Sequence, residues 1–82
     1  MTEQEIRALI IEEIGNIAPE TDATNVPLNA DLREALDLDS MDLFNLVVAL
    51  SERLELDIPE VDVPMLTTLA GATAYLVKHV QR

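Results

Sequence analysis

The sequence predicts an all-α fold, a small four-helix bundle with three main helices, one short helix and a long structured loop between the first and second main helices. Three stretches repeat aliphatic residues at steps of three and four, which is the spacing of one helical face. No stretch alternates polar and apolar residues as a half-buried strand does. The 82 residues are expected to form one domain, residues 1–82, with an aliphatic core, because Phe44 and Tyr75 are the only aromatic residues.

The first helix is predicted over residues 2–17. Thr2 and Glu5 have the spacing of a capping box, in which each side chain accepts a hydrogen bond from a free backbone N–H of the first turn. Gly15 and Asn16 both tolerate a left-handed conformation and are expected to end the helix. Its buried face is predicted to contain Ile6, Leu9, Ile10, Ile14 and Ile17.

Residues 18–38 are predicted to form a long loop, because prolines and asparagines interrupt any helix there. A loop of this length is unusual in a compact domain. Its aliphatic side chains are therefore expected to pack on the core, with one helical turn over residues 32–36. The aliphatic residues concerned are Val26, Leu28, Leu32, Ala35 and Leu36.

The second main helix is predicted over residues 40–54. Asp39 or Ser40 is expected to cap its first turn, because both side chains accept hydrogen bonds from free backbone N–H groups. Its buried face is predicted to contain Leu43, Leu46, Val47, Leu50 and Leu54.

Two helical segments are predicted after it. A short turn over residues 60–63 is expected to stop there, because the ring of Pro64 limits anything longer. The last helix is predicted to start at Thr67 or Thr68, and Gly71 is expected to weaken it by about 1 kcal/mol relative to alanine. Its buried stripe is predicted to contain Leu69, Ala72, Leu76 and Val80.

The charge of the chain excludes several classes of partner. Sixteen acidic and five basic residues give a net charge of −11. Such a polyanion repels nucleic acids and anionic membranes, whereas protein partners with basic docking surfaces are attracted, and self-repulsion favours a monomer. No run of about 18 apolar residues is long enough to span a membrane. Because the first residues also lack the character of a signal peptide, a cytoplasmic protein is expected.

No metal or catalytic site is expected. The absence of cysteine excludes a disulfide framework and a cysteine-ligated zinc site, and His79 is the only histidine. Asp37, Asp39 and Asp42 suggest a calcium loop, but Met41 and Asp42 stand where an EF-hand needs a ligand and a glycine. The position of His79 near the end of the last helix leaves no triad, so the chain is not expected to be an enzyme.

Ser40 is the candidate functional residue. It is one of two serines and lies where the long loop turns into the second main helix. A phosphate ester on its hydroxyl would face free backbone N–H groups and the positive end of the helix dipole. A serine at a helix start also serves as an ordinary cap, and the spacing alone does not distinguish the two roles.

Four blocks of sequence point to a known family. They are Asp39-Ser40-Met41, Leu46-Val47-Val48-Ala49-Leu50, Leu56-Asp57-Ile58-Pro59 and Leu66-Thr67-Thr68-Leu69. With these blocks at matching spacings, residues 32–76 resemble the acyl carrier proteins, and the first block resembles their attachment motif with methionine in place of the usual leucine.

The resemblance implies a covalent cofactor at Ser40. A separate phosphopantetheinyl transferase would attach 4′-phosphopantetheine from coenzyme A there, with magnesium, and the terminal thiol would hold acyl groups as thioesters. Carriers of this kind also hold the acyl chain between their helices. The resemblance further implies that Asp39, Met41, Asp42 and Glu52 help the transferase and the acyl-transferring and acyl-modifying enzymes to recognise the chain.

The chain departs from well-known carriers of fatty-acid synthesis on the second main helix, where an acidic exposed face is usual. At positions where those carriers commonly have acidic residues or a more typical apolar residue, this chain has Asn45, Val48, Ser51 and Arg53. Between residues 40 and 54, Asp42 and Glu52 are offset by Arg53, which leaves a net charge of −1. This difference favours a specialised carrier outside housekeeping fatty-acid synthesis, because surface charge helps to select partners.

Two alternatives remain open from the sequence. An aminoacyl or peptidyl carrier is a close variant, but such domains tend to be less acidic and to lie within long enzymes, whereas this chain begins at methionine without flanking linkers. An unmodified acidic helical adapter explains the charge and the helical periodicity, but leaves the motif around Ser40 as a coincidence. A Ser40→Ala variant distinguishes the adapter from a carrier, because only carrier function needs the hydroxyl.

Overall fold

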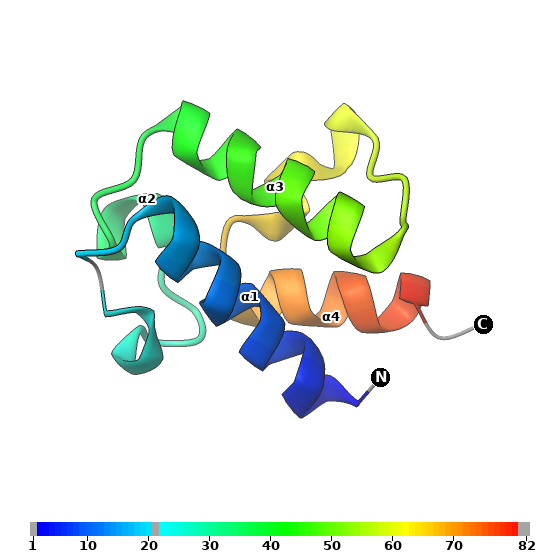
Figure 1. Cartoon of the computed structure of the whole chain (residues 1–82), viewed down its shortest axis with the longest axis horizontal. Coiled ribbons are helices and arrows are strands. Elements are labelled where there is room, and N and C mark those ends of the chain that lie inside the picture. The colour runs from blue at the N-terminus through cyan, green and yellow to red at the C-terminus, as the bar shows by residue number, and fades with distance from the viewer. Residues whose placement is uncertain (1, 21, 81–82) are drawn as a thin grey trace.

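The aliphatic repeats form helices where the sequence predicts them in the computed structural model, which describes residues 2–20 and 22–80. The elements are α1 (Glu3–Ile17), the 3₁₀ segment η1 (Ala23–Asn25), α2 (Leu32–Ala35), α3 (Ser40–Leu54), the 3₁₀ segment η2 (Glu60–Leu66) and α4 (Leu69–Val80) (Figure 1). Within the described residues no strand occurs, and Asp31 and Thr68 form an isolated bridge. The all-α prediction is therefore confirmed.

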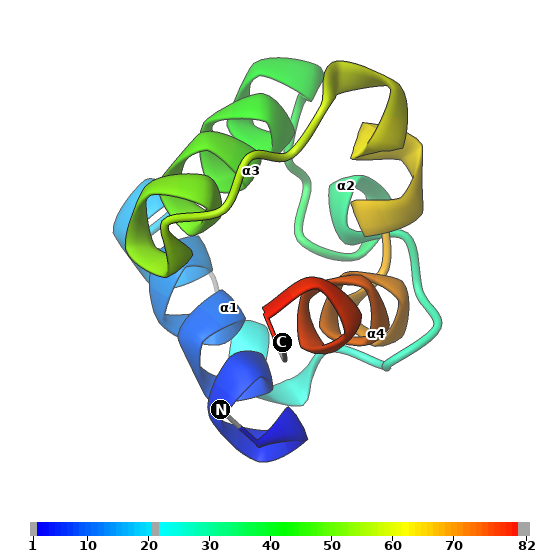
Figure 2. The same ribbon diagram turned by 90° about the vertical axis from the view of Figure 1, so that its right-hand side faces the viewer.

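The bundle closes as a ring of four elements. α1 packs against α3 and α4, and η2 packs against the other side of both α3 and α4, so the ring runs α1, α3, η2, α4 (Figure 2). Its largest fully buried side chains include Ile6, Ile10, Ile14, Leu32, Leu46, Leu50, Leu66 and Leu76. Ile17, Leu54 and Val80, the last members of the three predicted stripes, are only partly buried because they lie at helix ends.

The two ends of α1 differ in how well the sequence predicts them. The capping box is confirmed, since the Thr2 N–H donates to Glu5 Oε1 at 2.8 Å and the Glu5 N–H donates to Thr2 Oγ1 at 3.1 Å. The predicted left-handed ending at Gly15 and Asn16 is wrong, because neither residue has positive φ and the helix continues to Ile17. It ends at Ala18, where the following proline disfavours helical backbone.

The long loop docks on the bundle partly through its backbone. The predicted turn is present as α2, and Leu32 and Leu36 are buried. Leu28 and Ala35 are exposed, contrary to the prediction that they pack on the core. Instead of its side chain, Leu28 contributes its carbonyl oxygen, which accepts a hydrogen bond at 2.9 Å from the N–H of Ala70 in α4.

The prediction that Pro64 limits a short turn to residues 60–63 is wrong. η2 runs through Pro64 to Leu66, which is buried. Proline disrupts an α-helix because its ring clashes with the carbonyl four residues back, whereas bonds in a 3₁₀ segment reach only three residues back. The extra length lets η2 serve as the fourth wall of the bundle.

Gly71 is also assigned a different role by the tertiary structure. A Cβ atom at this position would lie 2.8 Å from the backbone oxygen of Met65 and 2.9 Å from Thr68 Oγ1. The glycine that was predicted to weaken α4 is therefore required, because only a residue without a Cβ atom lets α4 approach the end of η2 so closely. Thr68 caps α4, since its Oγ1 accepts a hydrogen bond from the Gly71 N–H at 2.9 Å.

Arg53, at a position where the second main helix departs from well-known carriers, joins α3 to α1. Its Nη1 lies 2.6 Å from Glu13 Oε2, and its Nη2 lies 3.6 Å from Glu12 Oε2. Glu13 is buried, and a buried carboxylate needs such a partner to offset its lost hydration. The guanidinium thus serves the fold and is turned toward acids of its own chain.

Tyr75 joins α4 to η2, and this contact predicts a pH dependence. Its hydroxyl donates to Asp62 Oδ2 at 2.6 Å, and this bond, with burial, raises the pKa of Tyr75 to about 12. A raised pKa favours the neutral phenol in the folded state. The stabilisation is therefore complete below about pH 10, the ordinary pKa of tyrosine, and is lost as the pH rises toward 12.

Near neutral pH, the free energy of unfolding of a Tyr75→Phe variant is expected to be about 1.5 kcal/mol lower than that of the wild type, because the variant loses a hydrogen bond to a carboxylate. Its alkaline loss of stability should also be smaller than that of the wild type. Urea unfolding of both proteins from pH 7 to pH 11.5 measures the difference, which should narrow above about pH 10. If the difference in free energy of unfolding between the two proteins stays constant with pH, the Tyr75 hydroxyl does not have the raised pKa that its hydrogen bond to Asp62 implies.

No helix among the described residues is long and apolar enough to cross a membrane.

Candidate functional site

Ser40 is the first residue of α3 and is exposed to solvent. The cap of α3 is Asp39, whose Oδ1 accepts a hydrogen bond from the Asp42 N–H at 2.8 Å. In return, Asp42 Oδ2 accepts one from the Asp39 N–H at 3.3 Å, which completes a capping box. No hydrogen bond engages the Ser40 hydroxyl within residues 2–20 and 22–80. The capping role that competed with the functional one thus belongs to its neighbour.

The backbone before α3 is held in place by Leu38 and Asp37. Leu38 is buried, and its N–H donates to the carbonyl oxygen of Arg33 at 2.9 Å. Asp37 has φ 55°, in the left-handed region that aspartate tolerates better than most residues. Because Leu38 is held by α2 and the core, the backbone that leads into α3 is anchored there.

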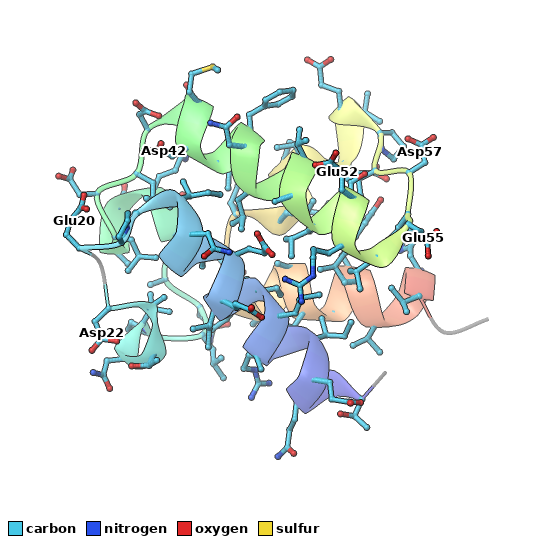
Figure 3. All side chains as sticks on the ribbon, in the orientation of Figure 1. Glu20, Asp22, Asp42, Glu52, Glu55 and Asp57 are labelled. Atoms are coloured by element: carbon cyan, nitrogen blue, oxygen red, sulfur yellow. The ribbon has the colours of Figure 1, made fainter. Side chains whose placement is uncertain are left out.

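The predicted recognition residues fall into two groups. Asp39, Met41 and Asp42 surround Ser40 in the first turn of α3. Asp42 is half-buried, and its side chain turns back to the cap. Glu52 is exposed but lies twelve residues along the helix, about 18 Å from Ser40. Figure 3 shows Asp42 and Glu52 toward opposite ends of α3.

A groove of about 210 Å³ runs between α3 and η2. Its apolar walls come from Phe44, Val47, Val48, Ile58 and Val63, and its polar rim comes from Ser51, Glu52 and Glu60. A second hollow, of about 440 Å³ between α1 and α4, contains none of the predicted recognition residues. A third hollow, of about 320 Å³ beside the start of α3, is lined by Asp42 but is less apolar, so the α3–η2 groove is the more apolar of the two hollows that contain a predicted recognition residue.

Sequence reasoning missed Phe44 as a surface residue. Its side chain is 48% exposed, although it lies between the buried positions Leu43 and Leu46. The available signal was its spacing from Met41 and Val48, at three and four residues, which defines a second apolar line beside the core-facing one.

The N-terminus of α3 fits a phosphate ester on Ser40. The first N–H groups of a helix have no partner within the helix, and Asp39 occupies only the N–H of Asp42 in the first turn. The backbone N–H groups of Ser40 and Met41 therefore remain available to phosphate oxygens, and the helix dipole favours the negative charge. Within the described chain no group of three or more histidine or acidic side chains is arranged to hold a metal ion.

The excess negative charge predicts a salt-dependent stability. A net charge of −11 on a small domain causes self-repulsion, which salt screens over about 10 Å at about 0.1 M. Raising NaCl from about 10 to about 200 mM is expected to raise the melting temperature by about 5 °C, equivalent to about 1 kcal/mol, and magnesium chloride should act likewise. A calorimetric melt unaffected by either salt would contradict this.

Most of this chain is similar to known proteins. A family model described as the phosphopantetheine attachment site matches residues 4–76. An acyl carrier protein of Rubrobacter xylanophilus is 32% identical over 76 residues, covering 93% of this chain and 88% of the relative. Those of Chlamydia trachomatis serovar L2 and Cyanidioschyzon merolae are each 30% identical, covering 94% and 96% of this chain and 94% and 86% of the relatives.

The match extends over most of the chain and over most of each relative, which confirms the predicted resemblance. Members of this family are carriers rather than catalysts. The chain belongs to the acyl carrier protein family, and its cofactor is a covalently bound 4′-phosphopantetheine.

Proposed function

We propose that Ser40 bears the phosphopantetheine and that residues 1–82 act as one carrier domain without catalytic activity of its own. In this proposal the chain carries acyl intermediates as thioesters for fatty-acid, polyketide or related specialised synthesis. The observation that carries the proposal is the exposed hydroxyl of Ser40, which is free of hydrogen bonds to the described residues while Asp39 caps the helix.

The residues around Ser40 would hold the phosphate of the cofactor. The free N–H groups at the start of α3 would donate hydrogen bonds to its oxygens, and the buried Leu38 would keep the attachment point in place. The cofactor supplies one thiol that forms thioesters. Because the chain has no cysteine, that thiol would be the only one on the modified protein.

The α3–η2 groove would accept part of the acyl chain. Its walls are aliphatic apart from Phe44, and it opens on the same helix that begins with Ser40. Burial of the cargo there would remove its apolar surface from water.

The proposed partners are a phosphopantetheinyl transferase and acyl-transferring and acyl-modifying enzymes with basic docking surfaces. Asp39, Asp42 and Glu52 would contribute to their recognition, because negative charge attracts basic surfaces over long range. The carrier would act as a cytoplasmic monomer.

A specialised pathway is favoured by the surface of α3. Asn45 and Val48 are exposed and uncharged, and Arg53 is engaged by Glu12 and Glu13 of α1. A ketosynthase of housekeeping fatty-acid synthesis from the same host is therefore expected to bind this chain more weakly than its housekeeping carrier. Equal affinity for the two carriers would defeat this assignment.

Intact-mass spectrometry tests the function directly. Incubation with a promiscuous phosphopantetheinyl transferase, coenzyme A and magnesium is expected to add one phosphopantetheine to the chain and to create one reactive thiol. Once the chain has been purified from coenzyme A and the transferase, a thiol assay reports the cofactor alone, because the unmodified chain contains no cysteine. If several transferases leave the chain unmodified and it never carries the cofactor in its host, the acidic adapter replaces this proposal.

A further inference from the structure

We propose that the hollow between α1 and α4 binds a free aliphatic carboxylic acid of medium chain length. Its carboxylate pairs with Arg7 and Lys78, and its apolar stem lies along α4. The acid is held without a covalent bond, at a place separate from Ser40. This site therefore goes beyond the proposed carrier function and does not depend on it.

The hollow lies across the bundle from the α3–η2 groove. The ring of elements runs α1, α3, η2, α4, so the seam between α1 and α4 is opposite the seam between α3 and η2 (Figure 2). Its volume of about 440 Å³ is within the usual range of small-molecule sites. A ligand bound there would leave both Ser40 and the groove accessible.

Arg7 has a hydrogen-bonding edge that is only half used. Its Nη2 lies 2.8 Å from Glu3 Oε1, whereas its Nε is buried and has no hydrogen-bond partner among residues 2–20 and 22–80. Nε and Nη2 form one edge of the guanidinium, and a single carboxylate can accept hydrogen bonds from both. Because a buried N–H without an acceptor is unfavourable, this edge favours a carboxylate that engages both nitrogens.

Glu3 competes only weakly for this edge. Its side chain is 66% exposed, and an exposed ion pair between residues one helical turn apart contributes little to stability. A ligand carboxylate that displaces Glu3 would also accept a hydrogen bond from Arg7 Nε, which Glu3 does not. Glu3 is therefore a replaceable partner of Arg7.

The rest of the hollow is mainly apolar and extends along α4. Ala70, Ala74 and Val77 line it, together with Leu28, which is 43% exposed. The Ala70 N–H donates to the carbonyl oxygen of Leu28 at 2.9 Å, which fixes this apolar end. Lys78 lies eight residues further along α4, a distance of about 12 Å. A ligand with an apolar stem and a negative head, such as octanoate, matches this length and polarity.

The charges around the hollow favour an anion, although the net charge of the chain is −11. α4 contains no acidic residue, and among the residues that line the hollow Arg7 and Lys78 outnumber Glu3. Thr73 also lines it, but its hydroxyl already donates to the carbonyl oxygen of Leu69 at 2.7 Å. The two cations are therefore the groups that recognise the ligand.

Titration of the unmodified chain with octanoate, followed by amide NMR spectra, tests the site. A dissociation constant of about 1 mM is expected, which is usual for a ligand of this size. The largest shift changes should fall on Ala70, Ala74 and Val77. Octanol, which has the same stem without the acid, should bind at least about tenfold more weakly.

Variants that remove one charge distinguish this site from the overall charge of the chain. The dissociation constant should rise at least about tenfold in Arg7→Gln and about threefold in Lys78→Gln, and it should fall about threefold in Glu3→Gln, which lacks the competing carboxylate. Arg33→Gln and Glu34→Gln are the matched controls, because they change the net charge equally but lie in α2, outside the hollow. Both controls should bind octanoate within about twofold of the wild type.

Four results would overturn the proposal. Arg7→Gln could weaken binding no more than Arg33→Gln, or Glu3→Gln could bind no more tightly than Glu34→Gln. Octanol could bind as tightly as octanoate. The shift changes could also lie in the α3–η2 groove, which would mean that the acid enters the proposed cargo site instead.

The fold and the carrier function are controlled separately. The amide spectra show whether each variant is folded, and Lys78→Gln keeps the test valid if Arg7→Gln disturbs α1, because Lys78 is exposed. Ser40→Ala should bind octanoate as the wild type does, since Ser40 is outside the hollow. Failure of the proposed function therefore leaves this result unchanged.

Discussion

Replacement of Ser40 by alanine is expected to abolish phosphopantetheine attachment completely, whereas replacement of Ser51 leaves it intact. The chain has only these two serines. Ser51 is partly buried, and its Oγ donates to the carbonyl oxygen of Leu56 at 2.6 Å, which closes the end of α3. Ser40 is exposed, and its hydroxyl has no such bond to the described residues. Intact-mass spectrometry of both variants after incubation with transferase, coenzyme A and magnesium measures the difference.

The stabilities of the two variants make this comparison decisive. Ser40→Ala should unfold within about 0.5 kcal/mol of the wild type, because Asp39 provides the cap. Ser51→Ala should lose about 1 kcal/mol, the usual value of a lost hydrogen bond. Ser40→Ala, which should not accept the cofactor, is therefore expected to be the more stable of the two variants, so that unfolding does not explain its failure. Undiminished modification of Ser40→Ala would mean that another residue carries the cofactor.

Replacements of the two glycines by alanine are expected to have opposite effects on stability. At Gly71 the added Cβ would lie 2.8 Å from a backbone oxygen of Met65, which cannot move away as a flexible side chain would. Relief of this overlap requires α4 and η2 to separate, and Gly71→Ala should lose about 1–3 kcal/mol. At Gly15 a Cβ would meet nothing within 4 Å, so Gly15→Ala should gain about 0.5–1 kcal/mol.

Urea unfolding of the wild type and both variants measures these changes, since each glycine lies within a helix and only its surroundings differ. A stabilised Gly71→Ala protein would show that α4 and η2 do not approach as closely as the structure has them. Because η2 walls the apolar groove, Gly71→Ala should also loosen that wall.

The features of this protein that depend on near neighbours could be predicted from its sequence. The spans of α1 and α3, the capping box of Thr2 and Glu5, and the place of Ser40 at a helix start follow from residues three or four apart. Interactions at that range form within one segment, so periodicity and capping chemistry reveal them. The matched motif blocks likewise identified the family before any contact was known.

The features that depend on residues far apart in the chain became visible only in the folded protein. Arg53 pairs with Glu13, forty residues away, and Gly71 is needed because Met65 comes close to it. The length of η2 depends on its packing against α3 and α4, and the exposure of Phe44 depends on where the bundle leaves that side chain uncovered. These features follow from burial and steric contact between separate elements, which local pattern does not record until the chain has folded.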